Sequence, residues 1–212
     1  MSAEVIEKRL VLFVDSSNVY HSFRALEIEP ASIDMLKFYE FITKRKSPTV
    51  RFYDALKNLG DNPKQYAKQQ QFHTELRKNH NLSIHLGKLQ QIRESSQSNI
   101  DYYARTLGFC KNCVGKLSGF VSAIGAKRQH REKGVDVRIA VDLIALADSN
   151  EYDTAILLSG DADLAPAVKY VVQKKGKIII NAHFGANSSK ELRDACTSSF
   201  MISPETINQC KK

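Results

Sequence analysis

Hydrophobic and polar residues follow one another along most of this chain with the periods of strands and helices. Five short apolar or alternating runs predict β-strands over residues 9–14, 50–56, 82–89, 154–158 and 177–181. Apolar residues at helical spacing predict helices over residues 19–26, 33–43, 63–79, 135–147, 164–175 and 188–195. A short edge strand is expected at residues 200–202, and a brief helix from residue 204. Strands that alternate with helices in this way predict an α/β protein with a parallel sheet.

Residues 91–132 interrupt this pattern with Ser, Gln, Gly and basic residues that have no sustained period. The segment is about 40 residues long, which is too long for a bare loop in a compact domain. We therefore expect a single domain over residues 1–212 with an irregular insertion at about 91–132.

Carboxylates stand at the ends of two predicted strands. Asp15 ends the first strand, and Asp161 and Asp163 follow the strand at 154–158 directly after Gly160. Ligands of open α/β sheets bind at the carboxyl ends of strands, so these acids are expected to converge. A lone aspartate at such a place is more often a helix cap, but close like charges need a cation, a shared proton or solvent. Mg²⁺ and Mn²⁺ prefer oxygen ligands, so the pattern predicts a metal site.

The charge balance favours a polyanionic partner. The chain has 31 basic and 23 acidic residues, a net charge of +8 and a pI near 9.3. Basic residues gather at 44–51, 127–133 and 174–177, and each cluster alone is typical of a solvated face. Carboxylates gathered inside a net-basic protein favour metal ions that contact a phosphate backbone.

The sequence has no apolar stretch of membrane-spanning length, and its first residues lack the features of a signal peptide. Four cysteines do not make a disulfide framework for 212 residues, so we expect a reduced, cytoplasmic protein. Cys110 and Cys113 have zinc-ligand spacing, but His130, Cys196 and Cys210 follow at irregular distances. Two interpretations stay open: free thiols, which we favour, or a zinc site shared across a homodimer.

Three motifs carry a resemblance to a known family. They are FVDSSN at 13–18, KGVDV through AVD at 133–142, and YDTA through SGDADL at 152–164. In this order they resemble the NYN domain, and more closely the LabA-like (DUF88) branch of the PIN-like nuclease superfamily, from about Arg9 to Ile202. The resemblance implies a PIN-like three-layer sandwich with helices on both faces of a parallel sheet in the order 3-2-1-4-5. It also implies an acidic cleft that binds Mg²⁺ or Mn²⁺, and ribonuclease activity.

The resemblance assigns roles residue by residue. Asp15 matches the family's first acid, Asp136 the acid that opens the central helix, and Asp161 and Asp163 the acids after the fourth strand. These four are the implied metal ligands and catalytic residues, and Asn18 matches the accompanying asparagine that orients a ligand or a water. A metal held by them would lower the pKa of a bound water and stabilise the negative charge of the transition state.

Further residues have supporting roles with alternatives. Ser159 is expected to hold the phosphate or to support the ligands, and Asp54 could flank the cleft. Asp142 lies about 240° round the helix from Asp136, so a structural hydrogen bond suits it as well as a site role. The residues expected to contact single-stranded or structured RNA are Lys127, Arg128, Arg131, Lys133 and Arg138.

Two functions from other classes remain as alternatives. The first is a non-catalytic RNA-binding or regulatory module that keeps the fold without turning over a substrate. The second is a Mn²⁺-dependent nucleotide-sugar transferase, with residues 161–163 as its metal motif. The second alternative leaves Asp15 and Asn18 without a role, and the chain is short for such an enzyme.

Overall fold

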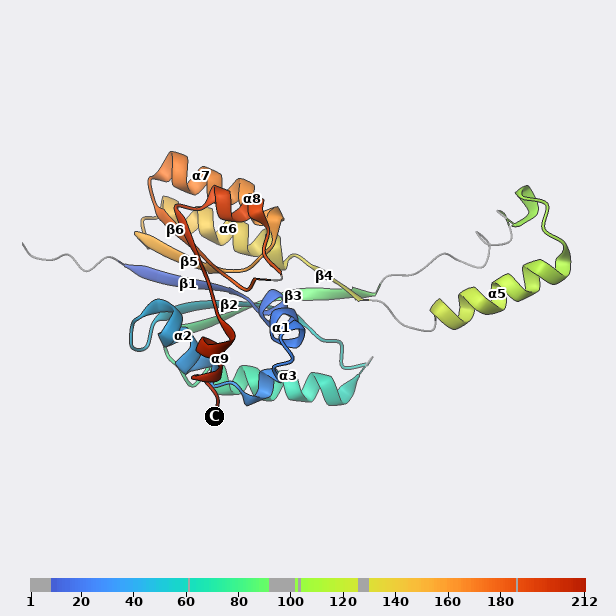
Figure 1. Ribbon diagram of the computed structural model, residues 1–212, viewed down its shortest axis with the longest axis horizontal. Helices are drawn as coiled ribbons and strands as arrows, with labels where there is room; N and C mark the ends of the chain where they lie inside the picture. The colour runs from blue at the N-terminus through green and yellow to red at the C-terminus, as the bar shows by residue number, and fades with distance from the viewer. Residues whose placement is uncertain (1–8, 61, 92–101, 103, 126–129, 186) are drawn as a thin grey trace, which may run out of the picture. The chain divides into compact units, whose positions relative to one another are not determined.

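The computed structural model describes residues 9–60, 62–91, 102, 104–125, 130–185 and 187–212 (Figure 1). The chain divides into two compact units. The first joins Met1–Lys88 with Gly134–Lys212, and the second is Leu89–Lys133. All the acids that the sequence analysis assigns to the site lie in the first unit.

Six parallel strands form the sheet that carries these acids. In order across the sheet they are β3 (Leu82–Gln91), β2 (Thr49–Leu56), β1 (Leu10–Asp15), β5 (Thr154–Leu158), β6 (Ile178–His183) and β7 (Ser198–Met201). The five strands expected from the sequence have the expected order, and β7 adds the expected edge strand. The strand β4 (His130–Lys133), which is the neighbour of β3 on the side away from β2, was not expected.

Helices cover both faces of this sheet, which gives three layers (Figure 1). One face carries α1 (Ser16–Ala25), α2 (Met35–Thr43), α3 (Pro63–Leu76) and α9 (Pro204–Asn208). The other face carries α6 (Val135–Asp148), α7 (Ala165–Lys175) and α8 (Lys190–Ala195). Short 3₁₀ turns at Pro30–Ser32 and Ala162–Leu164 precede α2 and α7. The three-layer α/β class expected from the sequence is confirmed.

The central strands consist of nearly continuous apolar residues because both of their faces are covered. Every residue of β5 is buried, and in β1 only Leu10 is partly exposed. On the α1 side, the ring of Phe23 contacts those of Phe38 and Phe184, with centroids 5.5 and 5.6 Å apart. Full burial of one such side chain contributes about 2–3 kcal/mol to stability. Packing on both faces thus fixes the carboxyl ends of β1 and β5 side by side.

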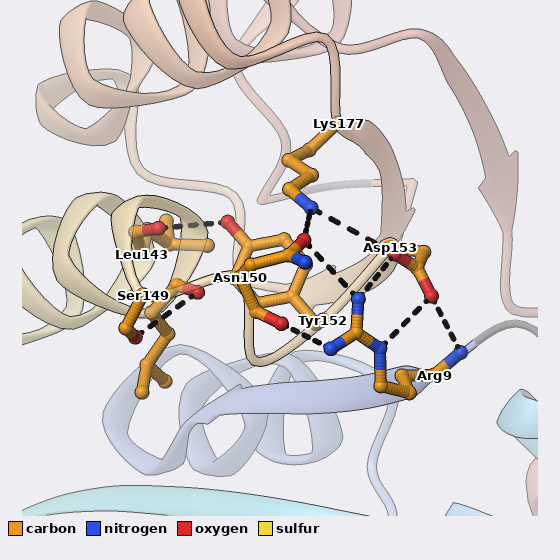
Figure 2. Close-up of polar contacts among 8 residues, drawn as sticks. Arg9, Leu143, Ser149, Asn150, Tyr152, Asp153 and Lys177 are labelled. Carbon is orange, nitrogen blue, oxygen red and sulfur yellow. Dashed lines mark hydrogen bonds and ion pairs between the residues drawn. The ribbon is translucent and has the colours of Figure 1, made fainter.

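A charged network joins the amino ends of β1, β5 and β6 (Figure 2). Arg9 donates hydrogen bonds to Asp153 through its backbone and its guanidinium, with Nη2 2.7 Å from Oδ1. Lys177 Nζ lies 3.7 Å from the same Oδ1, and both cations donate to Asn150. The hydrogen bond from the Arg9 side chain is the main cause that holds the pKa of Asp153 below its usual range.

The second unit contains α5 (Lys111–Gly125), β4 and the last residues of β3. The sequence pattern did not reveal the 15 residues of α5, because Gly115 and Gly119 weaken its helix propensity. Among the described residues of the chain, no helix is long and apolar enough to cross a lipid bilayer.

Candidate active site

Asp15 is the last residue of β1 and is buried, with 4% of its surface exposed. Its Oδ1 accepts a hydrogen bond from the backbone N–H of Asn18 at 3.1 Å, so Asp15 caps α1. Its Oδ2 accepts a hydrogen bond from the hydroxyl of Ser159 at 2.8 Å. The cap role that a lone aspartate would have is therefore present, and it engages only one of the two oxygens.

The environment of Asp15 disfavours its ionised form. Burial raises the pKa of Asp15 to about 6, and the two hydrogen bonds from Asn18 and Ser159 only partly oppose this shift. The negative charges of Asp136 and Asp161 raise the pKa further. A carboxylate in this state is stabilised by a proton or by a cation.

The turn after β5 carries the next two acids. Asp161 caps the 3₁₀ turn, with its Oδ1 accepting a hydrogen bond from the N–H of Asp163 at 2.9 Å. Its own N–H donates to the hydroxyl oxygen of Ser159 at 3.2 Å. Ser159 is itself buried. It therefore links Asp15 on β1 to Asp161 beyond β5 through one hydroxyl group.

Gly160, between Ser159 and Asp161, is required by close packing. A Cβ atom at this position would lie 1.6 Å from the backbone carbonyl oxygen of Asn187, which no side chain tolerates. The Ser189 N–H donates to the Gly160 carbonyl at 2.9 Å, so the segment at 187–189 crosses directly over the turn. The glycine thus lets a second loop fix the backbone that presents Asp161.

Asp136 enters from a third element, the first turn of α6. The helix begins after Gly134, whose φ of 81° is in the left-handed region that favours glycine. Burial is the main cause that raises the pKa of Asp136, and the charges of Asp161 and Asp163 raise it further. Four acids from β1, α6 and the turn after β5 therefore form one electrostatically coupled group, which we call the acidic group: Asp15, Asp136, Asp161 and Asp163.

The acidic group is not a closed ligand cage. Among the described residues, no set of three or more His, Cys, Asp or Glu side chains is arranged to hold a metal ion. The donor chemistry nevertheless fits a hard divalent cation, because all donors are carboxylate oxygens whose mutual repulsion a cation relieves. Mg²⁺ commonly uses one or two carboxylates and several waters, so it needs no cage made by the protein alone.

Asp142, two turns further along α6, belongs to a separate network. Its Oδ2 accepts hydrogen bonds from Arg51 Nη2 and from the Tyr53 hydroxyl, each at 2.8 Å. Burial alone would raise the pKa of Asp142, but these two hydrogen bonds and the charges of Arg51 and His85 together lower it. His85 Nδ1 lies 3.8 Å from Asp142 Oδ2, and the His85 ring stacks on the ring of Tyr53. This arrangement agrees with the structural interpretation of Asp142.

Asp54 faces the opposite side of the sheet from the acidic group. In the parallel register Asp15 lies beside Tyr53, and side chains alternate along a strand, so Asp54 points toward α3. There its Oδ2 lies 2.8 Å from Gln69 Nε2 and 2.7 Å from His73 Nε2. The sequence analysis missed both partners, although two polar residues four apart on one helix face were a usable signal.

The expected RNA-binding residues are only partly described. Lys127 and Arg128 lie outside the described residues, and Arg131 is part of β4. Lys133 has an exposed side chain at the end of β4, and Arg138 has one on α6, in the turn after Asp136. Asn18 lies in the first turn of α1, next to the Asp15 cap.

A parallel sheet between two helical layers, with coupled acids at the strand ends, defines an α/β protein of the PIN-like class. The sequence model of the NYN domain matches residues 9–203, so the chain belongs to the NYN domain family. That family is part of the PIN-like nuclease superfamily, as the motifs indicated.

A solved structure shares the fold over the whole chain. It is the crystal structure of a protein of unknown function, VPA0982, from Vibrio parahaemolyticus RIMD 2210633. The two proteins are 21% identical, with a TM-score of 0.61 over 97% of this chain and 98% of the other. At this identity the similarity concerns the fold alone. Among curated proteins, none matches the chain.

Proposed function

We propose that this protein is a Mg²⁺- or Mn²⁺-dependent ribonuclease that hydrolyses phosphodiester bonds at the acidic group. The observation that supports this most is the gathering of carboxylates from three separate elements, where burial first and the neighbouring negative charges second raise the pKa of both Asp15 and Asp136. Carboxyl groups with perturbed pKa values at strand ends are typical of functional sites, because packing alone does not require them. Membership of a family of PIN-like nucleases supports the reaction class.

The residues of the acidic group have distinct tasks in this proposal. A divalent cation, when bound, would lower the pKa of a water and offset charge on the phosphate oxygens. Asp15 would act as the ionised ligand, oriented by the Asn18 N–H and the Ser159 hydroxyl. Ser159 would keep Asp15 and Asp161 in a fixed relation, because it is hydrogen-bonded to both. Asp136 and Asp163 would add the negative charge that selects a cation.

RNA is the proposed substrate because the protein has a net positive charge although four of its acids gather in the acidic group. Its net charge is +8, and Arg138 presents an exposed guanidinium in the turn after Asp136. Contacts of this kind give affinity for phosphates without sequence preference. The motifs at 13–18, 133–142 and 152–164 lead us to assign the protein to the LabA-like (DUF88) branch. The four cysteines make no disulfide framework, which leads us to assign a cytoplasmic location.

A second candidate is an RNA-binding module without catalysis. It is favoured by one observation: the net charge of +8 gives affinity for phosphates whether or not the acidic group is catalytic. The nucleotide-sugar transferase has no support from the family assignment.

Labelled single-stranded and structured RNAs, incubated with the protein and Mn²⁺ or with EDTA, separate the two candidates. The ribonuclease predicts cleavage that requires the metal. If the protein is a binding module, it should bind RNA and leave it intact. The logarithm of the binding constant should then fall linearly with the logarithm of the salt concentration, with a slope near −0.7 per phosphate neutralised on a single strand. Tight binding without Mn²⁺-dependent cleavage of any RNA would contradict the ribonuclease proposal and support the binding module.

A further inference from the structure

Two cysteines meet at the start of α5 in the second unit. Cys110 directly precedes the helix, and its carbonyl accepts the first helical hydrogen bond from the Val114 N–H at 3.0 Å. Cys113 lies in the first turn, and the sulfur atoms of the two residues are 3.3 Å apart. Both side chains are exposed, whereas Cys196 is half-buried and Cys210 is buried.

The geometry allows the two sulfurs to bond with little movement. Residues three apart in a helix lie side by side, and a disulfide bond is about 2.0 Å long. The 3.3 Å between the sulfurs therefore closes by rotation of two exposed side chains, without a change in the backbone. Neither sulfur is shielded from a reagent in solution.

The two thiols also differ in acidity, as an attacking and a resolving thiol must. A hydrogen bond from the backbone N–H of Cys113, and then the neighbouring Cys113 side chain, lower the pKa of Cys110. The same contact raises the pKa of Cys113. The position before a helix N-terminus favours a thiolate in the same direction, and the thiolate is the nucleophile in disulfide exchange.

We propose that Cys110 and Cys113 form a redox-active dithiol that exchanges with disulfides such as glutathione disulfide. The thiolate of Cys110 attacks one sulfur of glutathione disulfide and releases one glutathione thiolate. The thiolate of Cys113 then attacks the Cys110 sulfur of the mixed disulfide and releases the second glutathione. The protein dithiol is oxidised, glutathione disulfide is reduced to two glutathione molecules, and the two thiol protons pass to these leaving groups.

A zinc site is the competing explanation for this spacing. Structural zinc takes four ligands in a tetrahedron, and Cys110 and Cys113 supply two. Among the described residues no set of three metal-binding side chains includes them. Among the described residues, the pair is therefore sufficient for a disulfide bond and insufficient for a structural zinc site.

Equilibration of the purified, metal-free full chain in glutathione redox buffers tests the proposal. Free thiols are trapped by alkylation and located by mass spectrometry. The expected result is that Cys110 and Cys113 lose reactivity together, with the loss of two hydrogen atoms and no bound glutathione, while Cys196 and Cys210 remain reduced. In Cys113→Ser the mixed disulfide should persist on Cys110, because the resolving thiol is gone. Cys196→Ser, which changes a cysteine outside the pair, should behave as wild type.

A rate measurement gives a second, independent readout. With an alkylating reagent near neutral pH, Cys110 in Cys113→Ser should react faster than Cys113 in Cys110→Ser, by up to about tenfold. Two results would overturn the proposal: thiols that stay reduced or glutathionylated in wild type at oxidising ratios, or stoichiometric zinc that binds a dimer through Cys110 and Cys113. The readouts do not involve RNA, so they stand apart from the proposed ribonuclease.

Discussion

The amino and carboxyl edges of the same sheet differ in how their aspartates are compensated. At the amino edge, Asp153 is paired with Arg9 and Lys177, and the hydrogen bond from Arg9 lowers its pKa (Figure 2). At the carboxyl edge, Asp15 accepts hydrogen bonds only from the uncharged Asn18 N–H and Ser159 hydroxyl among its described contacts. Burial and nearby acids raise its pKa to about 6.

This difference separates a structural role from a functional one. At the amino edge the carboxylate of Asp153 is paired with two cations of the protein, so this edge needs no ligand. The carboxyl edge is stabilised only when a proton or a cation arrives. Strands of five or six residues keep the two edges about 17–20 Å apart, far beyond the about 4 Å at which an ion pair forms. The cations of one edge therefore cannot neutralise the acids of the other.

The largest expected effect concerns catalysis. Asp15→Asn and Asp161→Asn should each reduce Mn²⁺-dependent RNA cleavage by about three orders of magnitude, because water activation and charge stabilisation fail together. The double variant should be little worse than either single variant. Initial cleavage rates per folded molecule provide the measurement.

Two controls use aspartates outside the acidic group. Asp153→Asn makes the same chemical change at the amino edge, and Asp148→Asn makes it on α6, where the exposed Asp148 pairs with Lys175. Both should retain cleavage rates per folded molecule near those of wild type. A loss in Asp153→Asn as large as that in Asp161→Asn would remove the distinction between the edges.

The next largest effect is on stability and its pH dependence. Because the pKa of Asp15 is raised from 3.8 to about 6, the folded state binds its proton more tightly than the unfolded state. The resulting stability is fully present below about pH 4 and is lost as the pH rises through about 6, a difference of about 3 kcal/mol. Asp15→Asn should remove this loss, so the apo variant should be more stable than wild type above about pH 7.

Urea unfolding across this pH range measures the effect, and Asp153 supplies the opposite control. The pKa of Asp153 is lowered, so its contribution is present at neutral pH and disappears on acidification. Asp153→Asn should therefore lose stability at neutral pH. If Asp15→Asn were less stable than wild type at every pH, a purely structural cap would explain Asp15.

The smallest effect is expected at the amino edge itself. Arg9→Gln removes a solvent-exposed ion pair, and such pairs contribute little to stability. Its melting temperature should fall slightly, and its cleavage rate and Mn²⁺ dependence should stay unchanged. Differential scanning calorimetry with a parallel cleavage assay checks this, and a changed metal dependence would link the two edges.

Local patterns predicted the six parallel strands and most helices but not β4, because burial of both sheet faces leaves long apolar runs such as residues 154–158. Local patterns also placed Asp15 and Asp161 at the ends of two strands. The family resemblance supplied the strand order that makes these strands neighbours, as the pairing of β1 with β5 has it. The helix α5 escaped prediction because Gly115 and Gly119 lower its helix propensity.

Contacts between distant residues could not be predicted in the same way. Asp142 finds Arg51, 91 residues away, and the direction of Asp54 depends on which face of β2 packs on α3. The close approach of Asn187 to Gly160 also depends on how a distant loop folds back. In each case tertiary packing, and not the local sequence, decided which residue became the neighbour.

Calorimetric titration of Mn²⁺ into wild type, Asp161→Asn and Asp153→Asn tests the central difference most directly. We expect wild type and Asp153→Asn to bind the ion alike and Asp161→Asn to bind it far more weakly. Binding at about pH 6 should release more protons than binding at about pH 8, because a cation favours the ionised form of Asp15. Equal affinities for wild type and Asp161→Asn, or proton release that does not change with pH, would contradict a cation site at the carboxyl edge.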